Sequence, residues 1–98
     1  MPTYAVTARF RKDLAMLDPS DRSRFRRAVE QLVEDLSSPG RRPRAGLRVK
    51  GVRGADGVFE MTWARDGRAT FEYGDEQQVG EPHAIWRRIG THDIFGRP

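Results

Sequence analysis

An amphipathic segment with clear signals at both ends, between residues 18 and 40, constrains the fold more than any other feature of this sequence. Asp18-Pro19-Ser20-Asp21 is typical of a helix start, because Asp18 can cap free N–H groups, Pro19 suits the first turn and Asp21 complements the positive helix end. Pro39-Gly40 ends the segment. Apolar side chains fall between these signals at helical spacing, on one face: Phe25, Ala28, Val29, Leu32, Val33 and Leu36. This helix needs an apolar surface to cover.

Segments with period-two alternation predict the sheet that would supply this surface. Tyr4–Phe10 alternates ahead of the helix and leads into a short helix at Arg11–Leu17, whereas Ser37–Gly46 is predicted to be a loop carrying Arg41, Arg42 and Arg44. Four further strands, separated by Gly-containing turns, are predicted at Leu47–Arg53, Val58–Ala64, Arg68–Tyr73 and His83–Ile89. The order β-α-α-β-β-β-β predicts an α+β domain spanning residues 1–98. Its two N-terminal helices would pack on one face of a mostly antiparallel sheet of four to five strands.

Composition narrows the class of protein. A chain of 98 residues with 37% hydrophobic and 33% charged residues is typical of one soluble globular domain. No apolar run is long enough for a membrane span, and the N-terminus lacks the features of a signal peptide, so a cytoplasmic location without membrane contact is expected. The absence of cysteine excludes disulfides and thiolate metal sites. No metal and no cofactor are expected.

The basic residues are almost all arginines. Of the 18 Lys+Arg residues only Lys12 and Lys50 are lysines, which leaves 18 − 2 = 16 arginines in a chain of net charge +4. Guanidinium groups grip phosphate through two hydrogen bonds, as lysine cannot. Codon usage in a GC-rich genome explains the same bias equally well, so the positions of the arginines matter more than their number.

Strand alternation predicts two different sheet faces. The rows expected against the helices are Leu47/Val49, Phe59/Met61/Trp63, Ala69/Phe71/Tyr73 and Ile85/Ile89, with Arg87 pointing to this side at an edge. The rows expected on the open face are Arg48/Lys50, Glu60/Thr62, Arg68/Thr70/Glu72 and Trp86/Arg88. A solvated sheet face is one explanation of the polar rows. Four cations facing two carboxylates favour another, a surface that binds nucleic acid.

The segment Glu81–Phe95 is the most informative stretch. Its Arg88, its Gly90-Thr91-His92 run and its Phe95 resemble the closing strand of RelE/ParE superfamily toxins, especially the YafQ-like ribonucleases. Other segments resemble further parts of that fold, so that the likeness covers nearly the whole chain: Phe10–Leu14, Leu47–Gly51, Gly57–Glu60 and Asp66–Arg68. The resemblance implies the toxin of a type II toxin–antitoxin system, with a cognate antitoxin protein as partner. In the RelE branch such a toxin is an endoribonuclease (mRNA interferase) that cuts mRNA, often on the ribosome, and inhibits translation.

The resemblance also implies site residues. Arg88 and His92 fall on positions that hold catalytic residues in YafQ-like members, and Arg68 falls on a widely shared sheet arginine. The chain departs from many RelE-type ribonucleases at Thr62, where they carry arginine, and it lacks the C-terminal tyrosine of RelE.

These residue types suit RNA cleavage by attack of the 2′-hydroxyl on its neighbouring phosphate. His92 can transfer protons near neutral pH, and Arg68 and Arg88 can stabilise charge on the phosphate. Glu60, on the same predicted face, is the carboxylate candidate for the base. RNA-binding residues are predicted at Arg48, Lys50, Arg53, Trp86 and Phe95.

Three of these residues also have a structural interpretation. His92 can satisfy a strand-end hydrogen bond, Glu60 can pair with Arg68 across the sheet, and Phe95 can pack in the core. Two other functions stay open as well: a non-enzymatic ParE-like toxin that poisons DNA gyrase, and a nucleic-acid-binding module without activity.

Overall fold

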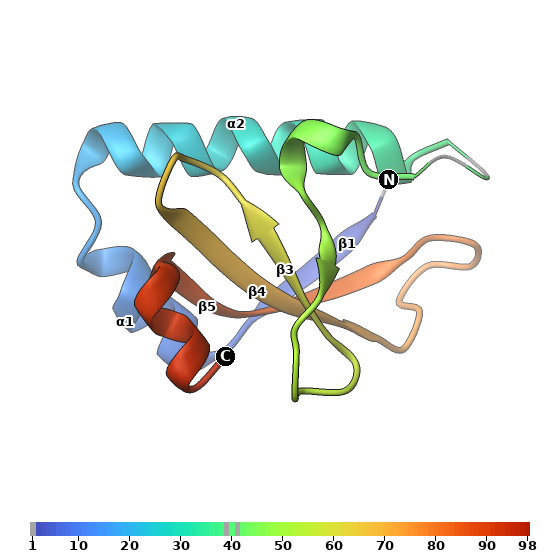
Figure 1. Ribbon diagram of the computed structural model, residues 1–98. Coiled ribbons are helices and arrows are strands. Elements are labelled where there is room, and N and C mark those ends of the chain that lie inside the picture. Colours follow the sequence, from blue (N-terminus) through green and yellow to red (C-terminus); the bar gives the residue numbers. More distant parts are fainter. Residues whose placement is uncertain (1, 39, 41) are drawn as a thin grey trace.

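The computed structural model describes residues 2–38, 40 and 42–98 and places a five-stranded sheet against two helices (Figure 1). In chain order the elements are β1 (Thr3–Val6), α1 (Ala8–Ala15), α2 (Pro19–Leu36), the 3-10 helix η1 (Ala45–Leu47), β2 (Lys50–Gly51), β3 (Val58–Thr62), β4 (Gly67–Gly74), β5 (His83–Thr91) and the 3-10 helix η2 (His92–Gly96). The strands lie in the order β1-β5-β4-β3-β2, with β1 parallel to β5 and the other neighbours antiparallel. The predicted α+β class and element order are confirmed.

Helix α2 begins where its sequence signals predict. The Oδ1 atom of Asp18 accepts a hydrogen bond from the N–H of Asp21 at 2.8 Å, which is the predicted cap. This hydrogen bond lowers the pKa of Asp18 below its ordinary value. The buried side chains of the helix include three from the predicted apolar stripe: Phe25, Ala28 and Leu32. Local signals therefore suffice to position the longest helix.

The first predicted strand is too long at its C-terminal end. Strand β1 ends at Val6, and residues Ala8 to Phe10 belong to α1. Thr7 causes this change, because its Oγ1 accepts a hydrogen bond from the N–H of Phe10 at 3.1 Å and donates one to the carbonyl of Arg87 at 3.0 Å. A helix cap thus replaces the strand alternation, and Phe10 enters the core from a helix.

The predicted strand Leu47–Arg53 is wrong over most of its length. Asp35 in α2 is 1% exposed and accepts hydrogen bonds from Arg44 Nη2 at 2.8 Å and Arg44 Nε at 2.9 Å, which holds the loop against α2. The hydrogen bonds raise the pKa of Arg44 above its ordinary value. From this anchor the chain turns through η1, with Leu47 buried and Arg48 at φ 50°, before the short β2.

A β-bulge in β5 reverses the predicted orientation of Trp86. Thr70 pairs with Arg88 and Phe71 pairs with Trp86, so Arg87 is an extra residue between the two pairs. Trp86 therefore points toward the helices, where it is 4% exposed and its ring lies 5.3 Å from that of Phe25. The same shift removes Ile85 from the predicted apolar row and turns Arg87 toward Glu72 on the open face, where their side chains form an ion pair at 3.2 Å.

The open face of the sheet is partly covered by the C-terminal turn. Ile94 of η2 is 5% exposed, and a Cβ placed on Gly90 would lie only 3.0 Å from its Cγ2 atom. Gly90 pairs with Arg68, and the side chain of Arg68 points to the open face. Because Ile94 lies against the same side of Gly90, η2 packs on the open face. None of the described helices combines the length and apolar character needed to cross a membrane.

Candidate functional site

Four side-chain positions form a row across four strands on the sheet face opposite the helices, and one of them, Thr70, is fully buried. Lys50 pairs with Glu60, Glu60 with Thr70, and Thr70 with Arg88. The Nζ atom of Lys50 lies 3.6 Å from Glu60 Oε1, and the side chain of Glu60 is 13% exposed. Glu60 therefore pairs with Lys50 and not, as one interpretation of the sequence held, with Arg68. The structure brings three predicted site residues together here: Lys50, Glu60 and Arg88.

Arg88 is held by a carboxylate from α1. Its Nε lies 2.6 Å from Asp13 Oδ2 and its Nη2 lies 3.3 Å from Asp13 Oδ1, with about 15% of each side chain exposed. Asp13 Oδ2 also accepts the N–H of Ile89 at 3.2 Å, and Arg88 Nη1 donates to the carbonyl of Arg97 at 2.9 Å. The guanidinium is thus fixed in position, and a carboxylate balances its charge.

Sequence reasoning assigned no role to Asp13. A signal was present, because Asp13 lies three residues after the buried Phe10 and therefore on nearly the same helical face, toward the sheet.

His92 lies at the start of η2, close to Phe95. Their ring centroids are 4.8 Å apart at an interplanar angle of 83°, an edge-to-face contact. His92 is exposed and Phe95 is half-buried, so Phe95 is not part of the closed core. Thr91 caps the turn by accepting the N–H of Asp93 at 3.3 Å. An exposed imidazole against an aromatic ring is accessible to a ligand from solvent.

A shallow hollow lies beside Arg88. It measures about 420 Å³ and lies between the start of α1, the loop after β2 and the C-terminal residues. Four arginines line it together with Thr7, Ala55 and Pro98: Arg9, Arg87, Arg88 and Arg97. Arg9 and Arg97 were not predicted as site residues. Arg87 is bound to Glu72 and Arg88 to Asp13, whereas no carboxylate among the described residues forms an ion pair with Arg9 or Arg97.

Arg68 and Arg48 line a separate hollow. The Nη1 atom of Arg68 donates to the carbonyls of Ala64, Arg65 and Gly67 at 3.4, 3.4 and 3.0 Å, so its guanidinium folds back over the β3–β4 turn. Arg48 lies across from it at the end of η1. Four of the predicted cations therefore divide into two pairs: Lys50 and Arg88 lie in the row across the sheet, and Arg48 and Arg68 line this second hollow.

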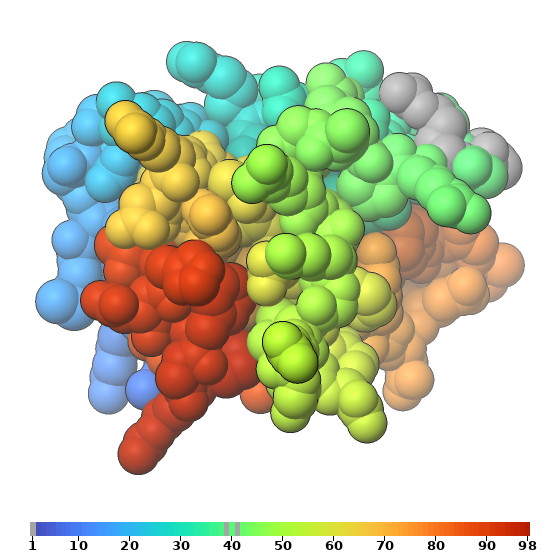
Figure 2. Space-filling view, in the orientation of Figure 1, coloured from blue at the N-terminus to red at the C-terminus, as the bar shows by residue number. Residues whose placement is uncertain are grey.

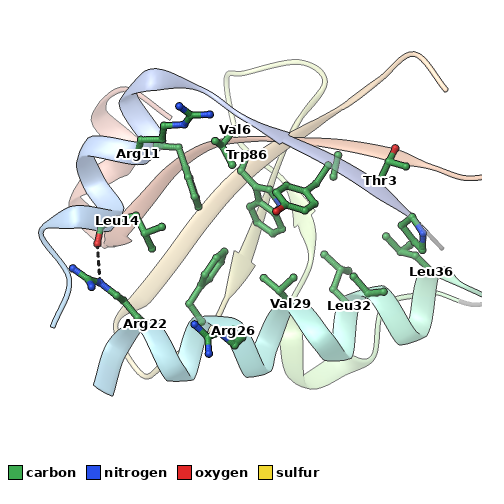
Figure 3. A pocket seen from close by; sticks show the side chains of 16 residues that line it. Thr3, Val6, Arg11, Leu14, Arg22, Arg26, Val29, Leu32, Leu36 and Trp86 are labelled. Carbon is green, nitrogen blue, oxygen red and sulfur yellow. Dashed lines mark hydrogen bonds between the residues drawn. The ribbon is translucent and has the colours of Figure 1, made fainter. Parts of the chain in front are cut away.

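Two further predicted RNA-binding residues lie elsewhere. Arg53 is exposed in the turn after β2. Trp86 is in the core, so its prediction as an exposed stacking residue is wrong. Trp86 forms part of the wall of an apolar groove of about 520 Å³ between β1, α1 and α2, and Arg11, Arg22 and Arg26 also line this groove (Figure 3).

Across the described chain, no cluster of three or more His, Cys, Asp or Glu side chains is arranged to hold a metal ion.

No protein-family model matches this sequence, and no curated protein matches it at a significant level. Solved structures do match. YafQ from E. coli is similar with a TM-score of 0.70 at 12% identity, covering 96% of this chain and 97% of that one. The E. coli DinJ–YafQ toxin–antitoxin complex gives 0.69 at 14% identity, covering 95% and 94%. The YoeB/ParE toxin from Agrobacterium tumefaciens gives 0.66 at 10% identity, covering 92% and 98%. The chain has the fold of the RelE/ParE toxins, as its sequence predicts.

Proposed function

We propose that this chain is the toxin of a type II toxin–antitoxin pair and that it cuts mRNA as an endoribonuclease. Proteins of the same fold over their whole length include YafQ, which has been crystallised in a toxin–antitoxin complex with DinJ. A cognate antitoxin and mRNA, free or on the ribosome, are the proposed partners. The observation that carries the enzymatic part is the open-face row from Lys50 to Arg88, together with the exposed His92 of the turn that packs on this face.

The proposed chemistry needs only protein side chains. The 2′-oxygen of a ribose attacks the adjacent phosphorus, the bond from phosphorus to the 5′-oxygen breaks, and a cyclic phosphate remains. A base accepts the 2′-hydroxyl proton and an acid donates a proton to the leaving 5′-oxygen. His92 acts as one proton-transfer group and Glu60 as the other, while Arg88 hydrogen-bonds the phosphate oxygens as charge develops on them. Phe95, against His92, offers a ring on which a base can stack.

One observation favours the non-enzymatic alternative. Arg88, placed by resemblance at a catalytic position, already has its charge balanced by Asp13 in a pair that is largely withdrawn from water. A guanidinium held in this way stabilises a developing phosphate charge less than a free one does. A toxin of this fold that binds DNA gyrase needs no proton-transfer group. It would therefore be indifferent to His92.

The test is cleavage of a fluorescent RNA by purified protein in the presence of EDTA. Under the proposal the wild type cuts, His92→Ala retains its circular dichroism but loses cleavage by about 100-fold or more, and a substrate with 2′-deoxyribose at the cut site is not cut. Cleavage by His92→Ala at the wild-type rate contradicts the assignment. If the wild type leaves RNA intact but blocks gyrase supercoiling, the non-enzymatic alternative replaces it.

A further inference from the structure

A second cationic hollow lies beside the β3–β4 hairpin, at one end of the sheet. It measures about 420 Å³ and lies between α2, η1 and the β3–β4 hairpin. In Figure 2 the hairpin (yellow) and the η1 segment (green) flank the part of α2 (cyan) that contributes to this hollow. Five arginines line it: Arg24, Arg27, Arg48, Arg65 and Arg68. We call this the hairpin hollow.

Most of this charge is uncompensated. Arg24 pairs with Asp21 at 2.8 Å, and Arg68 donates only to backbone carbonyls. Arg27, Arg48 and Arg65 are exposed, and among the described residues no carboxylate lies within ion-pair distance of them. Like charges gathered around one concavity repel one another and attract a polyanion. The hairpin hollow is therefore electrostatically suited to an anionic ligand.

Arg48 supplies a second, independent observation. It is the one non-glycine residue in the described chain with positive φ, at 50°, in the left-handed region. An L-residue with a long side chain is disfavoured there, and glycine or asparagine is the usual choice. Backbone strain of this kind is typically retained where the side chain has a function. Here it sets a guanidinium on the wall of the hairpin hollow.

The hairpin hollow is continuous with the proposed cleavage face. Arg68 pairs with Thr62, and this pair is the open-face row next to Glu60 and Thr70, two residues farther along each strand. Two residues of strand span about 6.8 Å, so one nucleic-acid strand can contact both places. Arg48 is likewise two residues from Lys50.

We propose that the hairpin hollow binds backbone phosphates of the same RNA strand, outside the stretch that is cut. This inference rests on the proposed function for the identity of the strand as RNA. The guanidinium groups contact phosphate oxygens without reading bases, so the hollow adds affinity for longer RNA and no sequence preference. An acidic protein segment is the other possible polyanion. The continuity with the cleavage face favours RNA.

The experiment compares two double variants that remove the same charge. Arg27→Ala with Arg65→Ala empties the hairpin hollow of two exposed cations, neither of which belongs to the proposed cleavage residues. Arg11→Ala with Arg26→Ala removes two exposed arginines from the apolar groove and serves as the control. Fluorescence anisotropy measures binding of one RNA of about 6 nucleotides and one of about 20, at several salt concentrations.

The expected result is specific to the longer RNA. For Arg27→Ala with Arg65→Ala its Kd rises about tenfold and the slope of log K against log salt falls by about 1.4, the value for two lost contacts to a single strand. The short RNA binds as tightly as it binds the wild type. An equal loss with the control variant overturns the proposal, as does an equal loss for both RNA lengths. Binding of a polyglutamate peptide that depends on Arg27 and Arg65, with RNA unaffected, assigns the hollow to a protein partner and also overturns it.

Cleavage separates failure of this inference from failure of the proposed function. The Arg27→Ala, Arg65→Ala variant should cut the short RNA at the wild-type rate. If the wild type cuts neither RNA but the length-dependent loss of binding persists, the hollow stands as an RNA site and the nuclease assignment falls. If the wild type cuts RNA but both double variants bind the long RNA alike, the hollow fails and the nuclease assignment stands.

Discussion

Asp13 binds Arg88 and the N–H of the next residue, Ile89, across a separation of 75 residues in the sequence. One carboxylate thus joins α1 to β5 beyond the point at which β1 stops pairing with β5. Beyond Trp86 this edge of β5 no longer pairs with β1, and Asp13 accepts the hydrogen bond of the Ile89 N–H there. Arg88 is fixed from both sides, since its Nη1 also donates to the carbonyl of Arg97 in the C-terminal segment.

Asp13→Ala should destabilise the fold strongly. The change leaves a guanidinium that is 15% exposed without its countercharge and removes the acceptor of the Ile89 N–H. The free energy of unfolding should fall by about 2–4 kcal/mol, measured by urea denaturation. Lys12→Ala, an exposed neighbour on the same helix, is the control and should cost less than about 0.5 kcal/mol. Equal stability of the two variants would show that the Asp13–Arg88 pair contributes little.

Gly90→Ala tests whether the position of η2 on the sheet matters for activity. The added Cβ would lie 3.0 Å from Ile94 Cγ2, so η2 and its His92 must move by a fraction of an ångström. We expect a stability loss of only about 1 kcal/mol but a fall in RNA cleavage of about 10- to 100-fold. Gly96→Ala, in the same turn with open space around it, should leave cleavage unchanged. Unaltered cleavage by Gly90→Ala would mean that the position of η2 does not limit the reaction.

Trp86→Phe and Phe95→Ala should affect different properties, the first the stability of the fold and the second RNA binding. Trp86 packs among Phe10, Phe25 and Phe71, so Trp86→Phe should lower the free energy of unfolding by about 1–3 kcal/mol and leave RNA affinity unchanged. Phe95 is half-buried beside His92, so Phe95→Ala should weaken RNA binding by about fivefold or more with a smaller effect on stability. Denaturation and anisotropy measure the two quantities. Loss of RNA affinity in folded Trp86→Phe would contradict the assignment of Trp86 to the core alone.

Asp18→Asn should show how the negative charge of Asp18, at the N-cap of α2, contributes to stability as the pH changes. The hydrogen bond from the Asp21 N–H lowers the pKa of Asp18, so its carboxylate stabilises the fold at pH values above the ordinary aspartate pKa. That stabilisation is lost as the pH falls through the lowered pKa of the folded state. Asparagine caps without titrating. The wild type should therefore have the higher Tm at about pH 7, and the difference should vanish at about pH 2. A difference in Tm that is constant across this range would exclude the charge as its cause.

Arg48→Gly should separate stability from RNA binding. Glycine adopts φ near 50° without a steric penalty, which offsets its larger loss of backbone entropy on folding, so stability should be equal to the wild type or higher by up to about 1 kcal/mol. RNA affinity should fall about threefold because one phosphate contact is lost. Arg53→Gly has no left-handed strain to relieve and should lower stability. A stability loss in Arg48→Gly as large as that in Arg53→Gly would argue against strain at residue 48.

Local sequence determined several elements of this protein. Helix α2 follows from Asp18, Pro19 and one apolar stripe, because capping and helical spacing act over a few neighbouring residues. The strands β3 and β4 follow from alternation between turn residues. The resemblance in Glu81–Phe95, together with weaker likenesses along the chain, indicated the RelE/ParE fold. The segregation of Lys50, Glu60 and Arg88 on one sheet face also followed from period-two alternation.

Only the tertiary structure decided which cations remain free and where Trp86 lies. The bulge at Arg87 shifts the register of β5 by one residue, and one residue is enough to move a side chain to the opposite face. The choice of Asp13 as the partner of Arg88 joins segments 75 residues apart in the sequence. The choice of Asp35 as the anchor of Arg44 depends on how the loop after α2 folds back against that helix. Alternation along a strand reports the face of a side chain, whereas its ionic partner is fixed only when the elements pack.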